Sequence, residues 1–246
     1  MKKILLFVIA VLVLAAMLWL FAPVGRGYPL LSQRLQPLEL QGLTGSLYQG
    51  SARSMRIAGV DLGQFHWHKQ WPTIPPGLQG EYRLQGLGYV LGGTAKLSGQ
   101  RGVQARSVNG HVPWQWIERF LRLPADRLQA EPQLALDELI YGPAGMERVN
   151  GRVTLRNLRI TTPFAVLLGD IWADIQTERT GLAIGTVRSD SQVLDVSGVI
   201  YLHPHRFEVN LVLKPKPGEY EAQHALLFIG QPTTGGGRRI QVAGFY

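Results

Sequence analysis

Apolar residues follow three patterns along this chain, and each pattern predicts a different element. An unbroken apolar run extends from Ile4 to Ala22, and no charged residue interrupts it. A helix of this length spans ~28 Å at ~1.5 Å per residue, close to the ~30 Å hydrocarbon core of a bilayer. From Glu39 onward, short apolar–polar alternations lie between glycine-rich turns, which is typical of antiparallel strands. Residues 111–128 instead repeat apolar positions every three or four residues, which predicts a short amphipathic helix.

The flanks of the first apolar run predict how it is oriented. Lys2 and Lys3 precede the run, and Trp19 lies near its far end, where an amphipathic ring suits the membrane interface. The positive-inside bias places the N-terminus in the cytoplasm and the rest of the chain across the membrane. We therefore expect residues 1–22 to form a cytoplasmic stub and an uncleaved transmembrane signal anchor. The anchor residues are Ile4, Leu12, Trp19 and Ala22.

A cleaved signal peptide is the alternative for this run. Such peptides usually have an apolar stretch of ~7–15 residues that ends in a small-x-small site. A cut after Ala22 would place Leu20 at the third position before it and Pro23 directly after it, and both are unfavourable. Because the run is also longer than usual, we favour the anchor, and in both cases the body is exported.

The rest of the chain divides into a spacer and a β domain. Residues 23–38 contain Pro29 and Pro37, which discourage one long helix, and they are expected to form a juxtamembrane spacer. Residues 39–246 are expected to form the exported, periplasmic β domain. Its two β stretches, 39–110 and 132–246, are candidate halves of a loose pseudo-repeat, joined by the helix-containing segment 111–131.

The clearest hairpin lies late in the chain. Alternate residues from Leu194 to Leu202 are apolar or glycine, alternate residues from Phe207 to Leu213 match them, and residues 203–206 form the turn. One apolar face and one polar face mean that such strands cover a core on one side only. The expected fold is mainly β: antiparallel meander sheets, forming a curved sheet or a sandwich, with one short amphipathic helix.

The expected helix carries several aromatic residues. Pro113 lies near its start and Pro124 marks its end. Trp114, Trp116 and Phe120 are candidate partner-docking residues. The alternative is that the helix caps the end of a β core, since its apolar stripe has ordinary core-facing spacing.

Composition and charge exclude several classes of function. The chain has 25 Lys and Arg against 17 Asp and Glu, but the basic residues are dispersed, and Arg238–Arg239 is the one adjacent pair after Lys2–Lys3. A nucleic-acid interface would cluster basic residues and interleave aromatic ones, so no nucleic-acid partner is expected. Cysteine is absent, which excludes disulfides, thiol catalysis and cysteine-based metal sites.

No pattern for catalysis or cofactor binding occurs in the sequence. Nucleophile-elbow, zinc-protease, Walker A and EF-hand motifs are absent. His66 and His68 would share a strand face, and His203 and His205 flank a proline, but a metal site needs three or four ligands. We therefore expect a binding or structural protein, not an enzyme, with no catalytic, cofactor-binding or metal-binding residue.

Several segments in a fixed order resemble one family, protein N of the type II secretion system (general secretion pathway protein N). A G-x-L/V-W-x-G-x-A segment of the family is similar to Gly45–Ala52, with Tyr48 in the usual tryptophan position. Trp67 and Pro72 resemble a W-x-x-x-P ending, one residue further apart. Val112–Trp116 resembles the segment that begins the helix, and Leu226–Gly236 is similar to a late L-x-L-L-G-x-P-x-x-x-G segment.

This resemblance implies an accessory inner-membrane component of the machine that exports folded proteins from the periplasm through the outer membrane. It implies other inner-membrane or periplasmic secretion subunits as partners and assigns no catalytic residue. The protein would cross the bacterial inner membrane once, with its C-terminal domain in the periplasm. The sequence pattern of the β domain is also similar to that of AsmA-like envelope proteins, whose sheets form apolar grooves. The alternative function is therefore binding or moving lipid in a β groove.

Overall fold

The computed structural model describes nine segments of the chain: residues 38–46, 48–57, 60–69, 78–98, 102–121, 128–142, 144–162, 165–227 and 229–245. The expected anchor and residues 23–37 of the spacer lie outside these segments, so they stay predictions. Within the described segments, no helix has both the length and the apolar character needed to cross a membrane.

The chain splits into two compact units, residues 1–87 and residues 88–246. Each unit is built from antiparallel strands, which confirms the mainly β fold. The candidate repeat halves 39–110 and 132–246 stay a prediction, because compactness says nothing about internal similarity.

The first unit contains a three-stranded sheet and four strands of a second sheet. One sheet has the strand order β1-β4-β5, and in the other β7, β6, β3 and β2 follow one another. The strands are β1 (Leu38–Gln41), β2 (Thr44–Gly45), β3 (Gln49–Ala52), β4 (Ser54–Ile57), β5 (Val60–Asp61), β6 (Gln64–Lys69) and β7 (Leu78–Gly86). In β6, Phe65 and Trp67 are half-buried while His66 and His68 are exposed, as the period-two pattern predicts.

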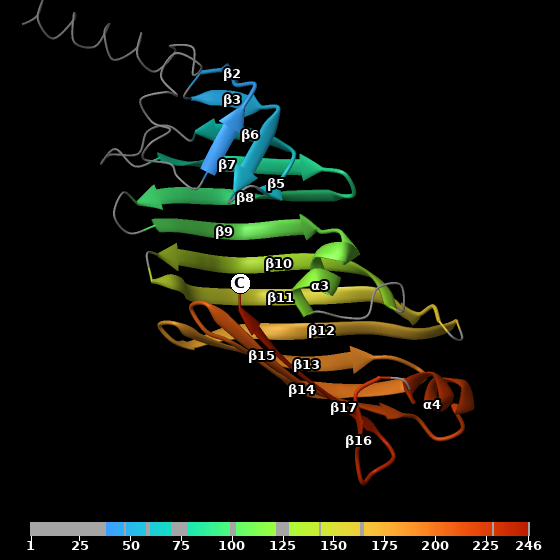
Figure 1. Cartoon of the computed structure of the whole chain (residues 1–246). Coiled ribbons are helices and arrows are strands. Elements are labelled where there is room, and N and C mark those ends of the chain that lie inside the picture. The colour runs from blue at the N-terminus through green and yellow to red at the C-terminus, as the bar shows by residue number, and fades with distance from the viewer. Residues whose placement is uncertain are drawn as a thin grey trace, which may run out of the picture. The chain divides into compact units, whose positions relative to one another are not determined.

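The second unit is one meander of long strands. Each strand from β8 to β15 pairs with the next along the chain, and β17 pairs with both β15 and the short β16. Figure 1 shows β8 to β13 side by side in chain order. The strands are β8 (Tyr89–Ser98), β9 (Gly102–His111), β10 (Leu128–Gly142), β11 (Gly145–Ile160), β12 (Val166–Arg179), β13 (Leu182–Asp190), β14 (Leu194–Leu202), β15 (Arg206–Pro215), β16 (Gln231–Pro232) and β17 (Arg238–Phe245).

The register of β14 and β15 confirms the hairpin expected from the sequence. Leu202 pairs with Phe207, and Val196 pairs with Leu213. The buried members of this ladder include Leu194 and Phe207, at 0% and 1% exposure. The apolar alternation therefore fixes which face of these strands meets the core.

Two helices pack on the sheet of the second unit. Helix α3 (Trp114–Leu121) confirms the predicted helix and contacts both β10 and β17. Helix α4 (Tyr220–Leu226), which the sequence pattern does not predict, contacts β12 and β15. A helix that contacts β10 and β17, strands far apart in the sheet order, requires the sheet to curl.

A hydrogen bond between two turns gives independent support for this curl. The Met146 N–H donates to the Pro204 carbonyl over 3.1 Å. These residues belong to the start of β11 and to the turn after β14, and a flat sheet would hold those strands ~14 Å apart, at ~4.8 Å per strand. We call this contact of Gly145 and Met146 with Pro204 and His205 the seam. Of the two arrangements left open by the sequence, the second unit has the curved sheet.

Candidate interaction site

The segment Gly45–Ala52, which carried the family resemblance, forms the β2–β3 hairpin of the first unit. The Ser46 Oγ accepts hydrogen bonds from the N–H groups of Tyr48 and Gln49, each over 3.2 Å. Such a serine bridge stabilises a tight turn without regular structure. Gly45 has a φ of +88°, a conformation that glycine adopts without steric cost.

A tryptophan from the neighbouring strand holds this hairpin in place. The Trp67 Nε1 donates to the Ser46 carbonyl over 3.2 Å, and the ring stacks on Phe65 with centroids 5.8 Å apart. A Cβ atom at Gly50 would lie 2.4 Å from the Trp67 ring, so position 50 requires glycine. Gly45, Gly50 and Trp67, which belong to the segments quoted for the resemblance, therefore shape and hold this hairpin.

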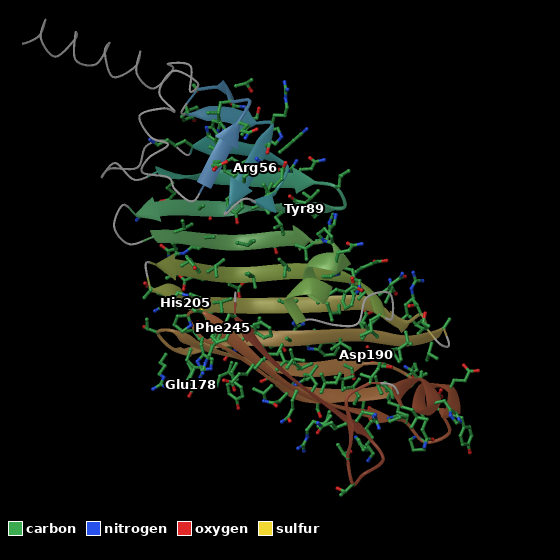
Figure 2. The ribbon with its side chains drawn as sticks, viewed as in Figure 1. Arg56, Tyr89, Glu178, Asp190, His205 and Phe245 are labelled. Atoms are coloured by element: carbon green, nitrogen blue, oxygen red, sulfur yellow. The ribbon has the colours of Figure 1, made fainter. Side chains whose placement is uncertain are left out.

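A hollow lies in the second unit, over the polar face of β10 to β13. Its volume is about 1090 Å³. The charged side chains that line it are Asp137, Arg152, Asp174, Glu178 and Arg188. Figure 2 labels Glu178, which belongs to this lining, near the β12–β13 turn.

An ion pair with an aromatic neighbour lies within this hollow. The Arg152 Nε is 2.6 Å from the Asp174 Oδ1, and the guanidinium carbon is 5.8 Å from the centre of the Trp172 ring. Arg188 lies directly opposite Trp172 in the strand register. Arginine and tryptophan are enriched among residues that contribute most to protein–protein binding. The sequence alone does not reveal this group, because Arg152 and Asp174 are 22 residues apart and only the strand register joins them.

A second group of charged side chains joins β9, β10 and β11. The Glu138 carboxylate accepts hydrogen bonds from Gln104 over 2.8 Å, from Arg148 over 3.3 Å and from Arg106 over 3.4 Å. The Gln104 hydrogen bond, followed by those of the two arginines, lowers the pKa of Glu138 below its usual 4.5 despite some desolvation. Glu138 is therefore a stable anion at neutral pH and binds three side chains across β9, β10 and β11.

Two carboxylates of the described segments have shifted pKa values, and both values are lowered. A hydrogen bond from the Gly63 N–H, followed by one from Ser54, lowers the pKa of Asp61. A general acid working near pH 7 needs a raised carboxylate pKa, and Asp61 and Glu138 are shifted in the opposite direction. No three histidine, aspartate or glutamate side chains gather there in a way that could hold a metal ion.

The structure places one of the three candidate docking residues in the interior. Trp114 is 9% exposed, so its ring belongs to the packing between α3 and the sheet. The side chains of Trp116 and Phe120 lie outside the described part, and their role in docking stays a prediction.

These observations define a mainly β protein with a curled antiparallel sheet and a hollowed, charged outer face. A family model described as type II secretion system (T2SS), protein N matches residues 36–241. The chain belongs to this family, which confirms the resemblance drawn from its motifs and assigns it to the type II secretion system.

Two proteins named type II secretion system protein N are similar to the chain. The one from Vibrio cholerae serotype O1 (strain ATCC 39315 / El Tor Inaba N16961) is 24% identical over 197 residues, covering 76% of this chain and 71% of that protein. The one from Aeromonas hydrophila is 25% identical over 202 residues, covering 79% of each. No solved structure matches the chain.

Proposed function

We propose that the protein is an accessory inner-membrane component of the type II secretion system. It acts as a structural or assembly subunit in the export of folded proteins from the periplasm across the outer membrane. The observation that carries this proposal is the family match over residues 36–241, which spans nearly all of the described body. The two similar proteins carry the name of the same secretion component.

The proposed location follows from the apolar run at the start of the chain. Residues 4–22 are long enough to span a bilayer, and Lys2 and Lys3 favour a cytoplasmic N-terminus. The protein would cross the inner membrane once and hold its C-terminal domain in the periplasm. Tethering would then keep a binding domain beside the secretion machinery.

The charged groups of the second unit support a binding role over a catalytic one. Glu138 is fixed as an anion by three neighbours, and Asp174 is paired with Arg152. These pairs are partly exposed, with 54% exposure for the Arg152 side chain. Exposed charge pairs add little to stability, but they add specificity and speed to association with a partner. We propose that the hollow over β10–β13 contacts another secretion subunit.

The described surface gives no specific support to the lipid alternative. A groove for acyl chains needs an apolar lining, since burying charged groups against hydrocarbon is costly. The hollow over β10–β13 is lined largely by charged and polar side chains. The large apolar side chains Ile160, Leu168 and Phe207 are each less than 2% exposed inside the second unit.

Deletion of the gene in its own bacterium, without polar effects, tests the proposed function. We expect export of secreted proteins to fall, with recovery when the wild-type chain is supplied. Normal export together with unchanged co-purification of the other secretion subunits would contradict the proposal. A version with residues 1–22 replaced by a cleavable signal tests the anchor. Full complementation by this version would show that the run serves only for export.

Charge reversal on the sheet tests the proposed contact surface. Asp174→Arg removes the pair with Arg152 and adds a third positive charge to the hollow, beside Arg152 and Arg188. We expect the folded variant to restore export less well than wild type. Glu221→Arg is the matched control, because Glu221 is exposed on α4, away from the lining of the hollow. Equal complementation by both variants would exclude this surface.

A further inference from the structure

A second, smaller pocket lies where α3 meets the sheet of the second unit. Its volume is about 400 Å³, and its lining comes from α3, the start of β10, the end of β11 and Leu167 at the start of β12. This volume is within the range of ~300–1,000 Å³ typical of ligand sites. The pocket is separate from the hollow over β10–β13, since no residue lines both.

One side chain in this lining has an unmet hydrogen-bonding requirement. Trp114 is 9% exposed, and its Nε1 is buried without a hydrogen-bond partner. A buried donor left without a partner costs ~1–3 kcal/mol. The indole nitrogen is therefore a group that a ligand with an acceptor atom would satisfy.

Two polar side chains of the lining, Arg159 and Gln129, are already paired with each other. The Arg159 guanidinium donates to the Gln129 Oε1 from Nη2 over 2.7 Å and from Nε over 3.2 Å. The remaining charged residues of the lining are Glu118 and Glu131, and neither forms an ion pair with another described residue. The pocket thus combines one unused donor with two carboxylates that can accept hydrogen bonds.

A polypeptide backbone has the matching chemistry. Each peptide unit carries one acceptor and one donor, so a carbonyl can accept from Trp114 while an N–H donates to Glu118 or Glu131. Leu167 lines the pocket and is 60% exposed, which offers a contact for an aliphatic side chain. A lipid chain fits less well, because it would cover the two carboxylates and Arg159 without pairing them.

We propose that this pocket binds an extended, aliphatic segment of a partner subunit, with its carbonyl on the Trp114 indole. The proposal rests on the proposed function for the identity of the partner, and it deepens that function by giving the partner segment its chemistry. Because the Trp114 nitrogen is itself buried, binding requires a local movement of the groups that cover it.

Fluorine NMR of the full-length chain, labelled with 5-fluorotryptophan in lipid nanodiscs, tests the proposal. The Trp114→Phe variant identifies the Trp114 signal among the six tryptophans. The probe is the blocked tripeptide N-acetyl-alanyl-leucyl-alanine amide. We expect a saturable shift of the Trp114 signal at millimolar peptide, with the Trp172 signal unchanged. The shift should weaken several-fold in Glu131→Gln and in Leu167→Ser.

Octanoate, a short acyl chain, is the competing probe. A shift with octanoate and none with the tripeptide would overturn the proposal in favour of a lipid site. No shift of the Trp114 signal with either probe would overturn it as well. Trp114→Phe also separates binding from folding. This change removes the unpartnered donor and keeps a ring of similar shape, so thermal stability should stay equal or rise.

Export measurements distinguish failure of this proposal from failure of the proposed function. Deletion of the gene tests the secretion role whether or not the tripeptide binds. If deletion reduces export while folded Trp114→Phe complements fully and binds the tripeptide normally, the pocket proposal fails and the secretion role remains.

Discussion

Replacing Gly145 with alanine tests the seam that joins β11 to the turn after β14. Gly145 has a φ of +98°, which an L-residue adopts at a cost. A Cβ atom there would lie 2.3 Å from the Pro204 carbonyl oxygen and 2.6 Å from the His205 ring. The substitution therefore strains the backbone of Gly145 and pushes the two turns apart.

The loss of unfolding free energy expected for Gly145→Ala has three parts. The left-handed conformation costs roughly 1–2 kcal/mol for a residue with a Cβ. Overpacking against a backbone atom that cannot turn away costs about 1–3 kcal/mol. Loss of the Met146–Pro204 hydrogen bond adds about 1 kcal/mol. The expected decrease in the free energy of unfolding is thus about 3–6 kcal/mol for Gly145→Ala.

Gly218→Ala is the matched control, because it carries only the cost of the left-handed backbone conformation. Gly218 has a φ of +89°, and a Cβ atom there would meet nothing within 4 Å. Its expected cost is only the roughly 1–2 kcal/mol of the left-handed conformation. For a chain of this size each kcal/mol lowers the melting temperature by ~2–4 °C, so Gly145→Ala should melt about 10 °C below Gly218→Ala.

Two measurements check this prediction on the full chain in nanodiscs. Differential scanning fluorimetry gives the two melting temperatures, and hydrogen exchange gives the protection of the Met146 amide. We expect lost protection in Gly145→Ala and normal protection in Gly218→Ala. Equal melting temperatures for the two variants, with the Met146 amide still protected, would refute the account of the seam.

Three further changes test the packing and the charges of the described residues. Phe207→Ala should cost about 3–5 kcal/mol in thermal or urea unfolding because the side chain is 1% exposed. Phe245→Ala, on a ring that is 80% exposed, should stay within about 0.5 kcal/mol. Gly50→Ala should cost about 1–3 kcal/mol and shift Trp67 fluorescence, since its Cβ would meet that ring. Because the pKa of Glu138 is lowered on folding, its contribution to the free energy of unfolding is complete above its usual pKa of 4.5. That contribution is lost as the pH falls through the lowered pKa. Acid unfolding of Glu138→Gln should therefore show a weaker pH dependence in that range.

The fold could be predicted from the sequence where the periodicity was strong. The alternation from Leu194 to Leu213 gave strand boundaries, the turn and the paired faces, because a shift of one residue would expose the whole apolar set. Helix α3 was also visible, since prolines bound its apolar stripe. Helix α4 was missed because its buried face consists of Ala222, Ala225 and Leu226, and small alanines give little contrast within seven residues.

The candidate surfaces could not be predicted, because they depend on contacts between strands. Arg152 and Asp174 looked isolated in the sequence and are joined by the pairing of β11 with β12. The burial of Trp114 also depends on the curl that brings α3 against both β10 and β17. Sequence periodicity identifies the apolar face of one element but not the second surface that covers it.

The order of pairing in the second unit has a consequence for how the chain folds. From β8 to β15 every strand pairs with its neighbour in sequence, so none of these pairings needs a strand from a distant part of the chain. Hairpins can form one after another as the chain emerges, without waiting for its C-terminus. The seam joins residues far apart in sequence and is expected to close last. Gly145→Ala should therefore accelerate unfolding much more than it slows folding, as stopped-flow measurements of both rates would show.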